Sequence, residues 1–182
     1  MTGDTTSIPA REQCLQLMDS QGMLPNIKAH SLTVCSYALS LATAANACGC
    51  NFDLAAIEAA ALLHDITKTR SLTTDENHAL TGAVLLRELG FAAIAGMVAG
   101  HVTPRESGDE LSAEELISYA DKRVLHDKVV SLEERFGYLY ERYGRDEHAV
   151  ERICRAQNRT RQIEMKLRAL LRSTDNLTGN FI

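Results

Sequence analysis

The chain has 182 residues, 45% of them hydrophobic, and a formal net charge of −5, so it can build one domain with a sizeable core and lacks the basic face of a nucleic-acid-binding protein. Its five cysteines are a poor disulfide framework, no apolar run reaches the roughly 18 residues of a membrane helix, and the N-terminal segment has no signal-peptide pattern. We therefore expect a cytoplasmic protein that contacts neither a membrane nor a nucleic-acid polymer.

Helical periodicity runs through the whole chain, and strand signals are nearly absent. Asn26 is the expected N-cap of a long helix that ends near Ala47, and Asp53 is the expected N-cap of a helix that ends near Asp65. A shorter helix should span about 91–101. Three further helix starts have the Ser/Thr-x-x-Glu pattern of a capping box: Thr73 with Glu76, Ser112 with Glu115, and Ser131 with Glu134. The sequence therefore predicts an all-α protein.

The C-terminal part is dense in charge, and it is predicted to be a helical extension over residues 129–175 with a tail at 176–182. Gly144 should break the extension into two helices. The second helix has a heptad-like stripe of residues spaced four and three apart: Ala149, Ile153, Ala156, Thr160, Ile163, Leu167 and Leu170. Such a stripe either packs on the body of the same chain, which we favour, or forms the seam of a homodimer.

Five of the predicted helices place a histidine or an aspartate on the side that should be buried. His30, for example, shares a face with Ile27 and Val34 by three-and-four spacing. The inward residues are His30, His64, Asp65, His78, His101 and Asp121. His126 and His148 serve as internal controls, because their helical neighbours predict a solvated position. Burying the inward set without partners would be costly, whereas a metal ion would turn its members into ligands.

The ligand types indicate which metals the chain could bind. No cysteine joins the set, which argues against structural zinc, and His/Asp ligation suits iron, manganese, magnesium, cobalt or nickel. So many candidate ligands favour two ions bridged by a carboxylate over one ion. A pair of ions about 3.5–4 Å apart generates hydroxide from water at neutral pH and stabilises an in-line displacement at phosphorus.

In their order along the chain, the inward residues resemble the HD superfamily of metal-dependent phosphohydrolases. The matching segments are His30, LLHDITK with His64 and Asp65, ENHALTGAVLLRELG with His78, then His101, and SYADKRV with Asp121. The resemblance covers about residues 25–127 and implies an all-helical HD domain at 1–128. It implies a first metal site formed by His30, His64, Asp65 and Asp121. Asp65 would then bridge to a second metal held by His78 and His101.

The resemblance also bears on Lys68, which occupies the last position of HDIxK and would contact substrate phosphate. Thr67 stands where the commoner HDIG form has glycine, and the GYP motif of cyclic-dinucleotide phosphodiesterases is missing. HDITK, HALTGA and the Ala-Asp pair at 120–121 are similar to the bacterial diadenosine tetraphosphatase branch. The basic KRV that follows this pair departs from that branch, so the substrate is not carried over.

We therefore expect a phosphohydrolase that cleaves a phosphate ester or anhydride of a small molecule, with a nucleotide as the favoured class. The metal ions would generate the attacking hydroxide, Asp65 would bridge them, and Lys68 would stabilise charge in the transition state. Lys68, Arg105 and Lys122 are the expected substrate-binding cations. The alternative is a signalling module of the same fold that binds metal and nucleotide but has little turnover.

Overall fold

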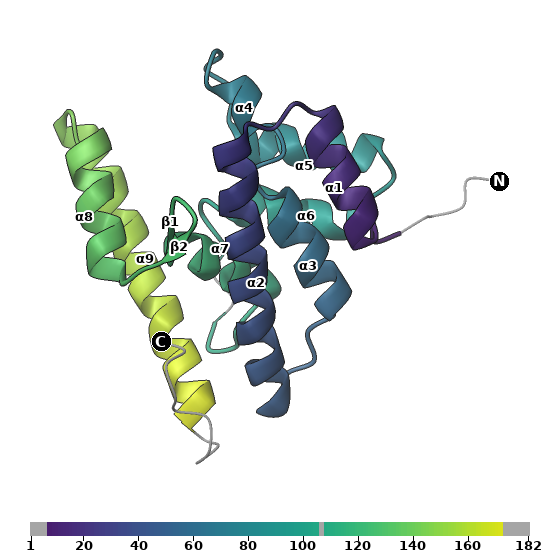
Figure 1. The fold of residues 1–182 in the computed structure, drawn as a ribbon. Coiled ribbons are helices and arrows are strands. Elements are labelled where there is room, and N and C mark those ends of the chain that lie inside the picture. The colour runs from purple at the N-terminus through teal and green to yellow at the C-terminus, as the bar shows by residue number, and fades with distance from the viewer. Residues whose placement is uncertain (1–6, 106–107, 173–182) are drawn as a thin grey trace.

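The computed structural model describes residues 7–105 and 108–172, and it confirms the all-α prediction (Figure 1). The helices are α1 (Arg11–Ser20), α2 (Pro25–Ala47), α3 (Leu54–Leu63), α4 (Lys68–Ser71), α5 (His78–Glu88), α6 (Ala92–Gly100), α7 (Ala113–Lys122), α8 (Leu132–Tyr143) and α9 (Glu147–Arg172). A small antiparallel hairpin joins β1 (Val124–Leu125) to β2 (Lys128–Val129). None of the helices in the described ranges combines the length and the apolar character that a membrane span requires.

Most of the predicted helix boundaries are confirmed. The Asp53 side chain accepts hydrogen bonds from the backbone N–H groups of Ala55 and Ala56, as an N-cap should. Ser112 and Glu115 form both halves of a capping box, and Ser131 accepts from the backbone of Glu134. Gly144 ends α8, so the charged segment is divided where the sequence predicted. The predicted tail at 176–182 lies outside the described residues.

Two predicted starts are wrong. The first long helix begins at Pro25 with Leu24 as its N-cap, because proline at the first helical position needs no N–H partner and has the right φ. The Thr73–Glu76 capping box does not form. Instead, Asn77 accepts from the backbone N–H groups of the residues that open α5, while Glu76 pairs with Arg70 at 2.8 Å. An asparagine directly before the helix is a better cap than a threonine four residues upstream.

The hairpin between α7 and α8 was not predicted. Val124 pairs with Val129 and Leu125 with Lys128, so His126 and Asp127 form a two-residue turn. His126 has a φ of 56°, the left-handed conformation that such turns require. Sequences with Asn-Gly or Asp-Gly are the usual signal for this turn, and His-Asp does not announce it.

The helices pack around α2, which contacts α3, α7 and α9. Helix α6 packs on α3, and α5 packs on α6. Helices α8 and α9 lie together beside this body, and we call the pair the arm (Figure 1). The inner side of α9 is buried at Thr160, Ile163 and Leu167, and it packs against α7. The stripe of α9 therefore covers the body of its own chain, while a homodimer stays a prediction.

Candidate metal centre

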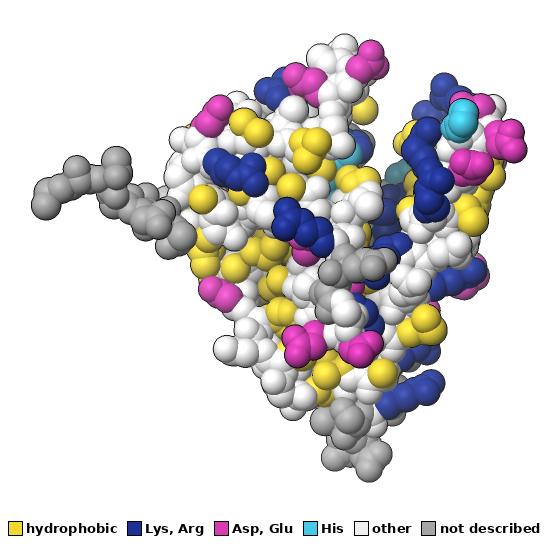
Figure 2. Space-filling view, turned by 180° about the vertical axis from the view of Figure 1, so that it is seen from behind, with side chains coloured by type: hydrophobic (Ala, Val, Ile, Leu, Met, Phe, Trp, Pro, Cys, Tyr) yellow, Lys and Arg dark blue, Asp and Glu magenta, His cyan; other side chains and the backbone are white. Residues whose placement is uncertain are grey.

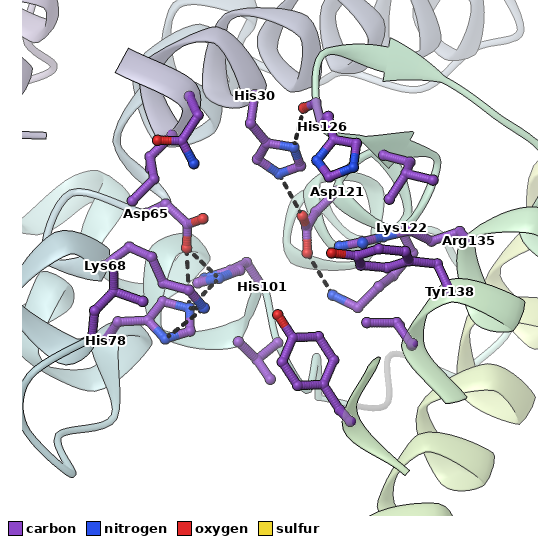
Figure 3. A pocket seen from close by; sticks show the side chains of 17 residues that line it. His30, Asp65, Lys68, His78, His101, Asp121, Lys122, His126, Arg135 and Tyr138 are labelled. Carbon is purple, nitrogen blue, oxygen red and sulfur yellow. Dashed lines mark hydrogen bonds and ion pairs between the residues drawn. The ribbon is translucent and has the colours of Figure 1, made fainter. Parts of the chain in front are cut away.

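The inward histidines and aspartates converge from five separate parts of the fold. His30 lies on α2, His64 ends α3, and Asp65 follows in the next turn. The others come from the first residue of α5, the end of α6, and α7: His78, His101 and Asp121. All but His64 line a pocket of about 430 Å³, and His64 is fully buried beside it (Figure 3).

Asp65, His78 and His101 form one compact group of possible ligands. The Nε2 atom of His78 lies 3.1 Å from Oδ1 of Asp65 and 3.2 Å from Nε2 of His101. His101 Nε2 lies 3.6 Å from the same carboxylate oxygen. Two ligands bound at about 2.1 Å to one ion, with tetrahedral or octahedral angles, are separated by about 3.0–3.4 Å. Two of the three distances fall in this range and the third is slightly longer, so the three atoms are close to the spacing of ligands of one cation.

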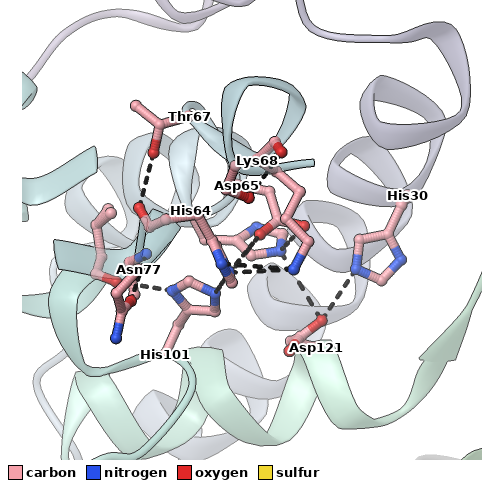
Figure 4. A network of polar contacts seen from close by, with 12 residues as sticks. His30, His64, Asp65, Thr67, Lys68, Asn77, His101 and Asp121 are labelled. Atoms are coloured by element: carbon pink, nitrogen blue, oxygen red, sulfur yellow. Dashed lines mark hydrogen bonds and ion pairs between the residues drawn. The ribbon is translucent and has the colours of Figure 1, made fainter. Parts of the chain in front are cut away.

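A second possible group consists of His30, His64 and Asp65, so Asp65 belongs to both groups. His64 Nε2 lies 3.6 Å from Oδ2 of Asp65, the oxygen that does not face His101. Asp121 lies beside this group, with Oδ1 2.9 Å from His30 Nε2 and 3.8 Å from His64 Nε2. In Figure 4, His30 and Asp121 lie together on one side of the cluster. The structure thus brings together all six residues predicted as metal ligands.

Three of the histidines have one ring nitrogen held by a backbone carbonyl. His64 Nδ1 lies 2.8 Å from the carbonyl of Ala61, and His101 Nδ1 lies 2.7 Å from that of Val98. His30 Nδ1 lies 2.9 Å from the carbonyl of His126. A carbonyl only accepts, so each Nδ1 carries a proton and each Nε2 faces the cluster. Metal-binding histidines are oriented in this way.

His64 provides the test of whether a cation fits the site. Its Nε2 is buried and has no hydrogen-bond partner within the described parts of the chain. A buried nitrogen lone pair that faces two carboxylates without a proton between them is unfavourable, and a divalent cation removes this cost. The donor set of imidazoles and carboxylates therefore fits divalent metal ions.

The electrostatics keep this ligand set ready for a cation at neutral pH. Burial lowers the pKa of His64 to about 4, so its imidazole is neutral. Burial alone would raise the pKa of Asp65, but His64 and hydrogen bonds from His101 and His78 hold it well below its usual range. Burial also opposes ionisation of Asp121, yet the Lys122 ammonium and His30 keep its pKa low. Both carboxylates are therefore charged.

The predicted substrate-binding cations are not all in the pocket. Lys68 lines it, with Nζ 3.4 Å from His78 Nδ1, and Lys122 lines it while paired with Asp121. Arg105 does not line it. Its side chain is exposed, and its backbone N–H donates to Glu114 and its carbonyl accepts from Arg159. Arg105 is close to His101 in the sequence, but this closeness did not reveal the direction in which the loop runs.

Thr67 explains how the chain tolerates the departure from the HDIG form. Its φ is −103°, a conformation that does not need glycine. Its hydroxyl donates to the carbonyl of His78 at 2.7 Å, which ties the HDITK turn to the first residue of α5. On α5, a Cβ at Gly82 would lie 3.2 Å from the Ile66 side chain, so a glycine there allows close packing against the HDITK turn. Thr67 thus fixes His78 beside Asp65.

Several pocket residues were not predicted. The hairpin supplies His126, and α8 supplies Arg135, Tyr138, Leu139 and Tyr143. His126 is exposed, as expected, but it lies at the pocket rim and holds His30 through its carbonyl. Figure 2 shows a hollow between the body and the arm, with histidine at its floor and Lys and Arg side chains on the arm. The sequence signal that could have indicated these pocket residues is the mixture of tyrosine and arginine in ERFGYLYERYGR.

Fold and site together define an all-α protein with a cluster of His and Asp side chains, able to hold a metal ion, at the bottom of an open pocket. The HD domain family matches residues 27–166, so the chain belongs to this family, whose members are generally metal-dependent hydrolases that bind divalent metals. The chain is also 30% identical over 143 residues to "Uncharacterized protein MJ0778" of Methanocaldococcus jannaschii, covering 70% of this chain and 83% of that protein. No solved structure matches the chain significantly.

Proposed function

We propose that this chain is a phosphohydrolase that uses two divalent ions to cleave a phosphate ester or anhydride of a small molecule, with a nucleotide as the favoured substrate class. The observation that carries the proposal is the position of Asp65 between two groups of possible ligands. One carboxylate oxygen lies 3.6 Å from His64 Nε2, and the other lies 3.6 Å from His101 Nε2. A carboxylate in this position suits a bridge between two ions.

The ligands would be distributed over two sites that share Asp65. His30, His64 and Asp121 would complete the first site, and His78 and His101 the second. Ions held there supply acidity to a water molecule and withdraw charge from phosphoryl oxygens. The chain's own contribution is rigidity, because backbone carbonyls fix the ring orientations of His30, His64 and His101.

Lys68 is the residue that we assign to the phosphoryl group that is cleaved. It begins α4, directly after the turn that holds Asp65, and its half-buried side chain reaches over His78. Within the described residues no carboxylate is paired with the Lys68 ammonium, which makes it the nearest unneutralised cation to the group of Asp65, His78 and His101. A positioned ammonium at this point would stabilise the negative charge that develops on phosphoryl oxygens.

The test is phosphate release from a panel of nucleoside mono-, di- and triphosphates and simple sugar phosphates, with Mn²⁺, Fe²⁺ or Mg²⁺ added to protein stripped of metal. We expect turnover that requires added metal and disappears in Asp65→Ala. Metal binding without turnover of any compound would contradict the proposed activity. That result would favour the alternative, a metal- and nucleotide-binding signalling module.

A further inference from the structure

We propose that α8 recognises the part of the substrate that is not cleaved, with Arg135 binding a second phosphate group and Tyr138 packing against a nucleobase. This inference rests on the proposed function and deepens it, because it names the substrate class as a nucleoside carrying at least two phosphates. The metal ligands and Lys68 come from α2, α5, α7 and the segments around α3, α4 and α6. The proposed recognition residues come from the arm.

The pocket has two chemically different sides. From α8 the pocket is lined by Arg135, Tyr138, Leu139 and Tyr143. The last three follow Arg135 by three, four and eight residues, which keeps all four on one side of the helix. In Figure 3, Arg135 and Tyr138 lie on the side of Asp121 and Lys122, with Lys68 and His78 across the pocket. A ligand held at the metal ligands would therefore face an aromatic and cationic wall.

Arg135 is the residue that points to an anion. Its Nε is buried and has no hydrogen-bond partner among the described residues, and the structure shows no ion pair between its guanidinium and any of them. Lys122, the other cation on this side, is already paired with Asp121. An arginine in a pocket wall of an acidic protein, without a carboxylate beside it, is suited to bidentate binding of phosphate.

Tyr138 is the residue that points to a flat ring. It is half-buried, and its ring meets the His126 ring edge to face, with centroids 5.5 Å apart and planes at 77°. The left-handed turn of the hairpin places His126 there and so fixes the tyrosine. An aromatic ring held in place at a pocket wall stacks on any nucleobase. Tyr143, 52% exposed, extends this wall toward the rim.

Arg135 is better matched to a second phosphate than to the cleaved one. Lys68 and the ions would neutralise the phosphoryl group at the metal centre, across the pocket from Arg135 in Figure 3. A nucleoside monophosphate would then leave the Arg135 guanidinium without an anionic partner. A nucleoside with a further phosphate would satisfy both sides, and a pocket of about 430 Å³ lies within the usual range for a ligand of such a size.

The experiment measures binding of ADP and AMP to Mn²⁺-loaded protein by calorimetry. Chromatography checks that each probe stays intact, and KM and kcat replace Kd where it is cleaved. We expect Arg135→Gln to weaken ADP binding by about tenfold or more and AMP binding by less than about threefold, the loss of one charge-assisted contact. Arg135→Lys should restore part of the ADP affinity. Tyr138→Leu should weaken both probes by about tenfold, and Tyr138→Phe should weaken neither.

The matched control is Arg142→Gln, which removes the same charge from the exposed side of α8, outside the pocket. It should change neither affinity. Equal losses for ADP and AMP in Arg135→Gln, or no loss, would overturn the second-phosphate assignment, and so would a wild-type protein that binds neither probe. The proposed function is judged separately by phosphate release. Arg135-dependent ADP binding without turnover would contradict the activity and leave the recognition assignment intact.

Discussion

His64 and His101 end two different helices in the same way and meet across Asp65. Each donates its Nδ1–H to the carbonyl three residues earlier, and their ring centroids lie 4.9 Å apart with the planes at 75°. Each Nε2 is 3.6 Å from a different oxygen of the Asp65 carboxylate. The two histidines are therefore equivalent halves of one arrangement, and Asp65 is the residue that they share.

This arrangement predicts how metal content divides among ligand variants. Asp65→Ala should lose both ions, because its carboxylate belongs to both ligand groups, whereas His101→Ala should lose one ion and keep the other. The measurement is metal per protein chain after purification without chelator, by inductively coupled plasma mass spectrometry. His148→Ala is the control, since this histidine is exposed on α9. Wild-type protein with a single ion would contradict the two-ion proposal, and Asp65→Ala with two would contradict the bridge.

The sequence was sufficient to predict that these His and Asp side chains converge, because helical periodicity decides which side chains are buried. His30 and Asp121 are 91 residues apart in the sequence. Each nevertheless occupies the apolar face of its helix, and both faces meet in one core. The choice between neighbouring candidate N-cap residues was harder to predict. At α5, for example, Asn77 rather than Thr73 caps the helix. Such a choice depends on which loop conformation the surrounding packing allows.

The arm side of the pocket was beyond the reach of the sequence for a different physical reason. Tyr138 reaches the pocket only because the His126 turn reverses the chain and α9 holds α8 beside the body. These are tertiary contacts, and no periodic pattern in the sequences of the contacting segments predicts them. The position of Arg105 after α6 suggested that it would lie in the pocket. In the structure its loop leads toward α9 instead. Helix faces were predictable, whereas the direction of loops was not.

Lys68→Ala should separate rate from metal binding. The ammonium cannot ligate a cation while protonated, so both ions and the fold should be retained. Turnover of the best phosphate substrate should fall by roughly ten- to a thousandfold, the range for loss of one charge-stabilising donor. Lys68→Arg should recover only part of the rate, because a planar guanidinium does not replace a compact ammonium. Steady-state kinetics beside metal analysis checks this, and a wild-type rate in Lys68→Ala would remove the residue from the mechanism.

Glu115 links α7 to α9 through ion pairs, and its substitution measures how much this link stabilises the fold. Its fully buried carboxylate lies 2.7 Å from Arg159 and 2.8 Å from Lys166, and it also accepts from the backbone N–H of Ser112. Glu115→Ala would remove the carboxylate that both cations contact and would open the capping box. We expect the free energy of unfolding to fall by about 3 kcal/mol, measured by chemical denaturation of the chelated protein.

The control for Glu115 is Glu133→Ala, which removes the same charge from an exposed position in the first turn of α8. It should cost less than about 1 kcal/mol, since only the interaction with the helix terminus is lost. Equal costs for the two variants would show that the buried ion pairs add nothing beyond a surface charge.

His64 predicts the pH dependence of the metal-free protein. Burial lowers its pKa from 6.5 to about 4 in the folded chain, whereas the unfolded chain keeps the ordinary value. Between these values the unfolded state binds a proton that the folded state does not, so stability is full above pH 6.5 and falls as the pH drops toward 4. The loss expected from this residue is about 3 kcal/mol. Burial lowers the pKa of His30, but hydrogen bonding to Asp121 raises it overall, so the stability that His30 contributes is fully present below pH 6.5 and is lost as the pH rises above that value. The difference between wild type and His64→Gln isolates the contribution of His64, because His30 is present in both.

Denaturation of chelated proteins from pH 7 to pH 4 should therefore show a steeper decline of stability in wild type than in His64→Gln. Parallel curves would mean that His64 is not held neutral by burial.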